Sequence, residues 1–432
     1  MNENKGIKFI IINRFCGGGE VMGVNNSIDN IDLQGKVIDV VNDEDIIIEK
    51  SISYSNFESI SYKLPSSSNV DTRIFGKLLE DSRVVASYKM YWLLGILEEV
   101  STGNANVVIP FKRIIARMIA GAWYPTLQYK LYFGQFDNLV KSIDYIASVY
   151  KKPANINSSE LLDFINNCDD KILNKQMKDL TNMVPYMLLT PFFDEKIKGI
   201  SGSERVRRIV ELSNIEPGVL YKIIKGDENK IEINEEWAKY MKDNYRVIKA
   251  WIYYRLTCFL QKRNPNVPAI MFKLDPPISR KLSAPTKIWT EIIEERKIKE
   301  IYTGKEFTKE NYECHGTLSI DHFIPWSFVM HDEMWNLVPT FKNINSRKSD
   351  KLLRYENYID DFCNIQYEAF SFICEKNRKK DLEQYVDMMR LENPLEFYKH
   401  KGKEGFSEKL RGSISPIYQI AVNQGFSVID KL

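Results

Sequence analysis

Paired cysteines and long apolar runs are missing from this sequence. Its six cysteines lie far apart and form no Cys-x-x-Cys pair, which argues against a structural zinc knuckle and against a disulfide framework. No apolar run approaches the roughly 18 residues that a membrane-spanning helix needs. The N-terminal stretch also lacks a convincing cleavage region for a signal peptide. We therefore expect free thiols, a cytoplasmic and reducing compartment, and no membrane partner.

An excess of charge of either sign is also missing. Lys and Arg together number 60, and Asp and Glu number 58, so the net charge neither indicates nor excludes a nucleic-acid partner. A nucleic-acid surface would have to come from local clusters of basic residues. The 432 residues have ordinary apolar and charged fractions, so the chain is long enough for two or three globular domains.

Local composition predicts an α+β protein that is mostly α-helical, with a β-rich N-terminal segment over residues 1–70. Within that segment, two stretches rich in Ile and Val, 35–41 and 46–49, flank the polar residues 42–45, which is typical of a hairpin. Residues 71–285 have helical periodicity and are interpreted as a recognition or scaffold domain.

One long helix is predicted from Glu235 to Gln261, because apolar residues recur there at helical spacing. Its expected apolar face comprises Trp237, Tyr240, Val247, Trp251 and Tyr254. Aromatic residues at this density also fit a surface that stacks on nucleic-acid bases. Core packing is the preferred interpretation at this spacing.

The segment that carries chemistry follows the proline-rich stretch around residue 276. A short strand is predicted over 318–325, a loop over 326–334, a second strand over 335–339, and a helix over 341–353. The first strand carries an Asp-His pair, and the helix carries an asparagine and several basic residues. Strand, loop, strand and helix in this order suit a nuclease that uses one metal ion.

Each of these polar residues suits a separate task in phosphodiester hydrolysis. His322 suits a general base, because imidazole alone has an ordinary pKa near neutrality. Asp321 and Asn345 offer the oxygen ligands that Mg²⁺ or Mn²⁺ prefers. Asn336 is placed to bond the loop backbone and hold His322. Neighbours on a regular strand point to opposite faces, so Asp321 and His322 serve one site only if the strand ends or bulges there, and Pro325 favours such an ending.

This segment resembles the HNH endonucleases, whose nuclease module is a ββα-metal fold, and in its motif it is most similar to the HNH domains of CRISPR RNA-guided DNA nucleases. The matching elements are Asp321-His322-x-x-Pro325-x-Ser327-Phe328, then Asn336, then Asn345-x-x-Lys348-Ser349-Asp350. Upstream, residues 302–306 resemble the glycine turn that precedes the first strand in that family. Many relatives carry zinc-binding cysteines around that turn, and this sequence does not, so no zinc is expected.

The resemblance implies roles for single residues. Asp321 and Asn345 would bind Mg²⁺ or Mn²⁺, His322 would act as the general base, and Asn336 takes the middle motif position. Lys348 is expected beside the scissile phosphate as a point charge. The basic residues expected to bind substrate are Lys342, Arg347, Lys351 and Arg354. On this basis we place the HNH domain at 286–355 and a helical extension at 356–432.

The predicted function is metal-dependent cleavage of nucleic acid, with DNA favoured over RNA. A bacterial nuclease with a large helical region suits restriction or anti-phage defence, with a homo-oligomer or an operon-encoded protein as partner. Two alternatives stay open: an inactive HNH module that only binds nucleic acid, and a nuclease subunit that a partner or small messenger must activate. Among the other histidines, His331 is the second candidate for the base, whereas His315 and His400 fit surface positions.

Overall fold

The computed structural model describes residues 36–40, 47–51, 64–103, 108–135, 137–276, 280 and 282–432. The chain divides into two units, Met1–Lys63 and Leu64–Leu432. In the first, strands β1 (Lys36–Val40) and β2 (Ile47–Ser51) pair antiparallel where the sequence predicts a hairpin. The wider prediction of a β-rich segment over 1–70 is not supported, because residues 64–70 contain no strand and residues 1–35, 41–46 and 52–63 lie outside the described residues.

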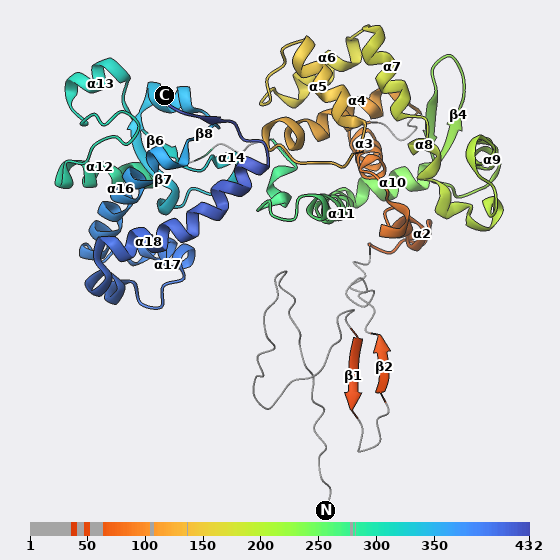
Figure 1. Ribbon diagram of the computed structural model, residues 1–432. Coiled ribbons are helices and arrows are strands. Elements are labelled where there is room, and N and C mark those ends of the chain that lie inside the picture. Colours follow the sequence, from red (N-terminus) through yellow and green to blue (C-terminus); the bar gives the residue numbers. More distant parts are fainter. Residues whose placement is uncertain are drawn as a thin grey trace, which may run out of the picture. The chain divides into compact units, whose positions relative to one another are not determined.

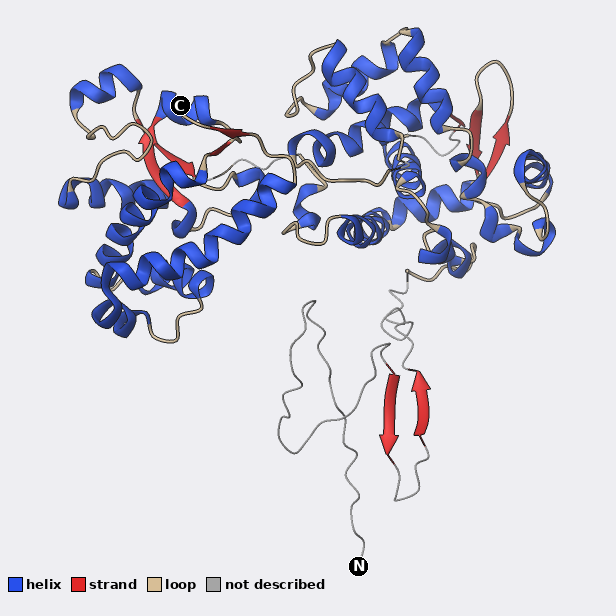
Figure 2. Cartoon of the chain, in the orientation of Figure 1, coloured by secondary structure: helices blue, strands red, loops and turns tan. Residues whose placement is uncertain are grey.

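Helices dominate the first part of the second unit (Figure 1, Figure 2). The α-helices are α2 (Thr72–Lys77), α3 (Tyr88–Thr102), α4 (Phe111–Trp123), α5 (Leu139–Val149), α6 (Ser158–Asn167), α7 (Lys171–Leu180), α8 (Val184–Met187), α9 (Gly202–Ile215), α10 (Glu235–Asp243) and α11 (Tyr245–Arg263). The short 3-10 and π segments are η1 (Asp81–Arg83), η2 (Tyr124–Gln128), η3 (Thr190–Phe192), η4 (Asp194–Ile197) and η5 (Ile270–Lys273). A small antiparallel sheet has the order β3 (Val108–Pro110), β5 (Lys230–Ile233), β4 (Tyr221–Ile224).

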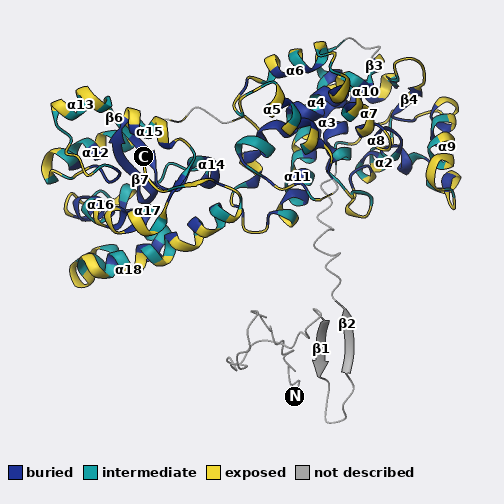
Figure 3. Cartoon of the chain, turned by 45° about the horizontal axis from the view of Figure 1, so that its top comes forward, coloured by how far each residue is buried: buried dark blue, intermediate teal, exposed yellow. Residues whose placement is uncertain are grey.

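Helices α3 and α4 form the centre of this helical core. Most of their side chains are buried, as the dark blue ribbon in Figure 3 shows. Gly95 in α3 permits their close approach, since a Cβ there would lie 3.0 Å from the Ile114 side chain and 3.2 Å from the Ile114 carbonyl oxygen. A larger residue at this position would push α4 away.

The single helix predicted over 235–261 is wrong, because α10 and α11 are separated at Asn244. Asn244 has φ −109° and ψ 19°, outside the helical region. The predicted apolar face is only partly correct. Trp237 is buried as expected, but Val247 and Tyr254 are 50% and 43% exposed. The break changes the phase of the helical repeat, so residues beyond it no longer continue the stripe of α10.

The remaining elements surround the segment that carries chemistry. They are α12 (Ser283–Arg296), α13 (Lys309–His315), β6 (Leu318–His322), α14 (Trp326–Val329), η6 (Met334–Asn336), β7 (Leu337–Phe341), α15 (Lys342–Lys348), β8 (Leu352–Leu353), α16 (Tyr355–Glu375), α17 (Lys379–Met389), α18 (Pro394–Asn423) and β9 (Val428–Ile429). Their buried apolar side chains form a second hydrophobic core, whose residues run from Ile288 to Phe426 in the sequence. The residues of the first hydrophobic core run from Phe75 to Leu274.

The helix predicted over 341–353 is shorter than expected. It ends at Lys348, because Ser349 adopts a φ of +51° and cannot continue a right-handed helix. Both residues of β8 are buried and pair in parallel with β9 near the end of the chain. Leu352 and Leu353, which the prediction included in the helix, therefore belong to a sheet.

The helices beyond residue 355 share the core of the nuclease-like strands. Gln366 in α16 is fully buried, and its Nε2 donates to the Leu337 carbonyl in β7 at 2.7 Å. Its Oε1 accepts from the Tyr385 hydroxyl of α17 at 2.7 Å. The core is thus continuous across residue 355, and the domain boundaries proposed at 70, 285 and 355 stay predictions.

The described part of the chain is mostly helical with a few small sheets, which agrees with the predicted α+β class. None of its helices combines the length and the apolar character that a membrane crossing requires. The five cysteines within the described ranges are free, and Cys314 is exposed.

Candidate active site

Strands β6 and β7 form the two-stranded sheet that carries the motif residues. They pair antiparallel, with Asp321 opposite Val338. The first strand begins at the predicted residue 318 but ends at His322 instead of 325, because α14 begins shortly afterwards. The second strand is shifted from 335–339 to 337–341, because η6 occupies its first expected residues. Helix α15 follows β7 directly and packs against β6, which places its side chains beside the Asp-His pair.

Asp321 is buried in an ion pair with Lys348. The Lys348 Nζ lies 3.0 Å from Asp321 Oδ2, and the two side chains are only 1% and 4% exposed. The same ammonium donates to the His322 carbonyl oxygen at 2.7 Å. The Tyr302 hydroxyl donates a further hydrogen bond to Asp321 Oδ2. Lys348 therefore neutralises the motif carboxylate, and its expected place beside a phosphate stays a prediction.

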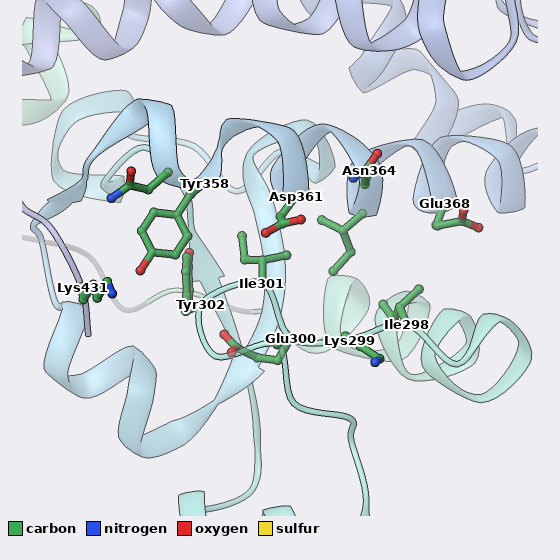
Figure 4. A pocket seen from close by; sticks show the side chains of 13 residues that line it. Ile298, Lys299, Glu300, Ile301, Tyr302, Tyr358, Asp361, Asn364, Glu368 and Lys431 are labelled. Atoms are coloured by element: carbon green, nitrogen blue, oxygen red, sulfur yellow. The ribbon is translucent and has the colours of Figure 1, made fainter.

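Tyr302 connects Asp321 to a cavity on this part of the molecule. Burial and then the charge of Asp321 raise the pKa of Tyr302 well above its ordinary value, so the hydroxyl is a donor at neutral pH. Its ring packs edge-on against Tyr358 at 5.9 Å between centroids. Both tyrosines line a cavity of about 650 Å³, together with Asp361 and Glu368 of α16 (Figure 4).

The glycine turn before β6 is held by Glu300. This side chain is fully buried and accepts from the Thr303 backbone at 2.7 Å and from the Thr340 hydroxyl at 2.8 Å. Gly304 has a φ of +70°, a conformation that favours glycine. The turn over 302–306 is therefore fixed to β7, and this fixes the Tyr302 side chain that reaches Asp321.

Asn345 lies over β6 on the side that carries Ser319 and Asp321. Its Nδ2 donates to Ser319 Oγ at 2.8 Å and to the Ile320 carbonyl at 3.2 Å. Among the described residues none donates to its Oδ1, which leaves that oxygen as an acceptor. Asn345 and Lys348 thus both approach the Asp321 face of the strand.

The donor atoms on this face fit a hard cation in their chemistry. A carboxylate and an amide oxygen are ligands that Mg²⁺ or Mn²⁺ accepts. Within the described ranges, no group of three His, Cys, Asp or Glu side chains is close enough to hold a metal ion. A cation at Asp321 would therefore depend on Asn345 and on non-protein ligands, and it would compete with the Lys348 ammonium.

His322 has a different set of partners. Its Nε2 lies 2.9 Å from Asp332 Oδ1, and its Nδ1 lies 3.4 Å from Nη1 of Arg280. In the described segments, no hydrogen bond joins the His322 ring to Asp321 or Asn345. Alternation along β6 accounts for the separation, because Asp321 and His322 are strand neighbours that point to opposite faces.

Asn336 fixes the chain immediately after His322. It is fully buried, its Oδ1 accepts from the Ile324 backbone N–H at 2.8 Å, and its Nδ2 donates to the Ile324 carbonyl at 2.8 Å. Its own carbonyl accepts from the Phe323 N–H at 2.9 Å. These bonds are the loop contacts expected of the middle motif asparagine, and its effect on catalysis stays a prediction.

Comparison with protein families matches residues 300–352 to the HNH endonucleases. This segment belongs to the HNH superfamily. It contains Asp321, His322, Asn336 and Asn345 within the matched range, and an HNH segment points to nuclease activity in general. Comparison with curated proteins and with solved structures gives no match.

The basic residues predicted to bind substrate lie at the edge of the HNH segment. Lys342 and Arg347 are exposed on α15. Lys351 donates to the Arg347 carbonyl at 3.5 Å, and Arg354 forms an ion pair with Asp430. None of the four has a hydrogen bond to Asp321 or His322 among the described contacts, so their role in binding stays a prediction.

The other histidines of the HNH segment and beyond have local partners. His331 packs on Trp335 at 5.1 Å, and burial lowers its pKa to about 4, so its ring is neutral at physiological pH. His315 lies 2.6 Å from the Lys305 ammonium, and His400 pairs with Glu396 at 3.1 Å.

Three residues at the site escape prediction from the sequence. The sequence pattern predicts Tyr302 only as a member of the glycine turn, with no contact to Asp321. Asp332 lies in a loop, where an acidic side chain is usually solvated, so no contact with His322 is predicted for it. Arg280 lies outside the residues matched to the HNH family. A search for polar residues about ten positions after the motif histidine would have found Asp332, but it would not have distinguished it from other loop carboxylates.

Proposed function

We propose that this protein is a metal-dependent endonuclease that hydrolyses phosphodiester bonds in DNA. The observation that carries the proposal is the arrangement within the HNH segment: Asp321 and His322 end one strand, and Asn345 and Lys348 come from the helix that packs on it. His322 would supply a base from one face of β6, and Asp321, Asn345 and Lys348 would supply oxygen ligands and a positive charge from the other face, so the two sets meet at one phosphate where the strand ends.

His322 acts as the general base in this proposal. It removes a proton from a water molecule as the water oxygen attacks the phosphorus atom. The bond between phosphorus and the leaving sugar oxygen breaks, and that oxygen takes a proton from solvent. Asn336 holds the loop that follows His322, so the ring stays in place during the attack.

Asp321 and Asn345 are the residues that would hold a divalent cation, with Mg²⁺ or Mn²⁺ as the expected ion. Such a cation, when bound, neutralises charge on the phosphate and on the leaving oxygen. Lys348 contributes a further positive charge beside Asp321. Lys342, Arg347, Lys351 and Arg354 are proposed to contact the nucleic-acid backbone.

The decisive experiment is cleavage of supercoiled plasmid by the full chain. Nicked or linear product should appear with Mg²⁺ or Mn²⁺ and disappear with excess chelator. The matched control is His322→Ala, which removes the base and leaves the Asp321 face unchanged. Full cleavage in excess chelator would refute the dependence on a metal ion. Cleavage by His322→Ala at the wild-type rate would refute the assignment of His322 as the base. A parallel RNA substrate tests the preference for DNA.

A second candidate is a nuclease that a protein partner or small messenger must activate. The ion pair between Lys348 and Asp321 favours it, because the motif carboxylate is already matched by an internal cation. A protein that is silent alone but cuts in the presence of its operon neighbour would support this variant. Restriction or anti-phage defence in the cytoplasm is the biological setting we propose for either form.

A further inference from the structure

The loop between α14 and η6 carries a carboxylate against the proposed base. We propose that Asp332 is a positioning residue that keeps the proton of neutral His322 on Nε2, so that Nδ1 is the nitrogen that accepts the proton from water. This inference rests on the proposed function, because it assigns the atom through which His322 acts.

The contact at Nε2 fixes the proton on that nitrogen. Asp332 Oδ1 lies 2.9 Å from His322 Nε2. An ionised carboxylate can only accept hydrogen bonds, so the ring nitrogen must donate. The His322 side chain is 4% exposed and Asp332 is 27% exposed, so solvent competes little for the ring. A charge-assisted bond of this length is stronger than a bond between neutral groups.

The contact at Nδ1 leads independently to the same tautomer. Arg280 Nη1 lies 3.4 Å from Nδ1, and a guanidinium has only donors. Nδ1 must therefore be the acceptor, with its single lone pair toward Arg280, and water reaches that lone pair when a bound phosphate draws the guanidinium away. The guanidinium also lies 5.1 Å from the centre of the Trp326 ring, which limits where it can move. Its positive charge marks the Nδ1 side of His322 as the side on which a phosphate is attracted.

The loop holds Asp332 in place from both ends. Met330 adopts a φ of +64° and its N–H donates to the Trp326 carbonyl at 2.8 Å, which turns the chain out of α14. Met334 N–H donates to Gln384 Oε1 of α17 at 2.7 Å. Met330 and Met334, which lie two positions before and after Asp332, are thus anchored. A carboxylate held in this way can fix the orientation and the tautomer of a histidine, because its hydrogen bond to one ring nitrogen decides where the proton lies.

The first test reads the tautomer without any catalysis. In the full chain labelled with ¹⁵N-histidine, long-range ¹H–¹⁵N spectra distinguish a ring protonated on Nε2 from a ring protonated on Nδ1, because the two nitrogens then give different chemical shifts and couplings. His322→Ala assigns the signal. We expect protonated Nε2 in the wild type. Arg280 still faces Nδ1 in Asp332→Ala and opposes a proton there, so a population with protonated Nδ1 is expected when both contacts are removed, in Asp332→Ala/Arg280→Met. An unchanged tautomer in Asp332→Ala/Arg280→Met would overturn the role of these contacts.

The second test measures turnover. Asp332→Ala should lower kcat about 10- to 100-fold with KM unchanged, the range seen when outer partners of a functional histidine are removed. Asp332→Asn keeps a carbonyl acceptor of the same size and should recover part of that loss. Glu333→Ala is the matched control, since Glu333 is the adjacent loop acid and caps no helix with its side chain.

The outcomes separate this inference from the proposed function. A wild type with protonated Nδ1, or an Asp332→Ala protein with unchanged kcat, overturns the positioning role. Equal losses in Asp332→Ala and Glu333→Ala would also overturn it, because the effect would then belong to the loop as a whole. A wild type that shows the expected tautomer but never cuts nucleic acid refutes the nuclease proposal instead.

Discussion

Replacing Lys348 with methionine tests the buried ion pair at the centre of the site. Methionine keeps most of the volume of the lysine side chain and removes its charge. Among the described residues, Asp321 would then keep only the Tyr302 hydroxyl as a side-chain donor, in a position that is 4% exposed. Removing one partner of a buried pair costs about 3–5 kcal/mol, because the other charge stays uncompensated. At about 2 °C per kcal/mol for a large domain, this is a fall of about 6–10 °C in melting temperature.

The assay is thermal and urea unfolding in excess chelator, with Lys342→Met as the control. Lys342 is exposed on the same helix, so its replacement should change stability by less than about 0.5 kcal/mol. The double variant Asp321→Asn/Lys348→Met should be more stable than Lys348→Met alone, because both charges are gone. A loss below about 1 kcal/mol in Lys348→Met would show that the pair contributes little and would refute the reasoning.

Divalent cations should act differently on the two proteins. Adding Mn²⁺ should stabilise Lys348→Met more than wild type, since the ion supplies the missing positive charge at Asp321 without displacing an ammonium. At a hundred times its Kd, a ligand that binds only the folded protein adds about 2.7 kcal/mol. Equal stabilisation of both proteins would mean that the cation does not bind at Asp321.

Three further predictions concern single residues. His322→Ala should lower turnover by about two to four orders of magnitude while sparing the melting temperature and DNA binding, and a wild-type rate would move the role of base to His331. Asn345→Ala should show a defect in metal use that Mn²⁺ eases in part, whereas Asn336→Ala should lose activity without a matching change in metal affinity; the reverse pattern in metal titrations would contradict both roles. Burial lowers the pKa of Lys273 to about 7, so between about pH 7 and 10 the unfolded chain binds more protons than the folded one. Stability should therefore rise with pH in that window, by at most about 1.4 kcal/mol per pH unit from this group, and urea titrations of Lys273→Met should show a shallower rise. If the stabilities of the wild type and Lys273→Met rise equally with pH, Lys273 does not have the lowered pKa assigned to it.

The sequence predicts the order of elements at the site better than their ends. The alternation of apolar residues and the spacing of the motif suffice for strand, loop, strand and helix. The end of α15 depends on Ser349, whose positive φ is not predicted by its residue type or by the local pattern. Likewise β8 exists only because β9, about 75 residues later, lies beside it. Pairing between strands so far apart in the sequence cannot be predicted from the pattern of neighbouring residues.

The motif residues could be predicted from the sequence, but the residues that contact them could not. Asp321, His322, Asn336 and Asn345 lie within the residues matched to the HNH endonucleases. Lys348 could be expected near the site, yet its burial against Asp321 follows from the way α15 packs on β6. Arg280 could not be predicted, because it comes from a segment outside the family motif.

The parallel pairing of β8 with β9 limits how the HNH segment could be transferred to another protein. Leu352 pairs with Val428 and Leu353 with Ile429, so a fragment that stops at residue 352 would expose an open strand edge. It would also leave the Leu337 carbonyl without the Gln366 amide that covers it. A transplantable fragment therefore has to run from Arg280 to Ile429, roughly three times the length of the segment matched to the HNH family. Evolutionary shuffling of the catalytic segment into another protein would have had to move the C-terminal helices with it.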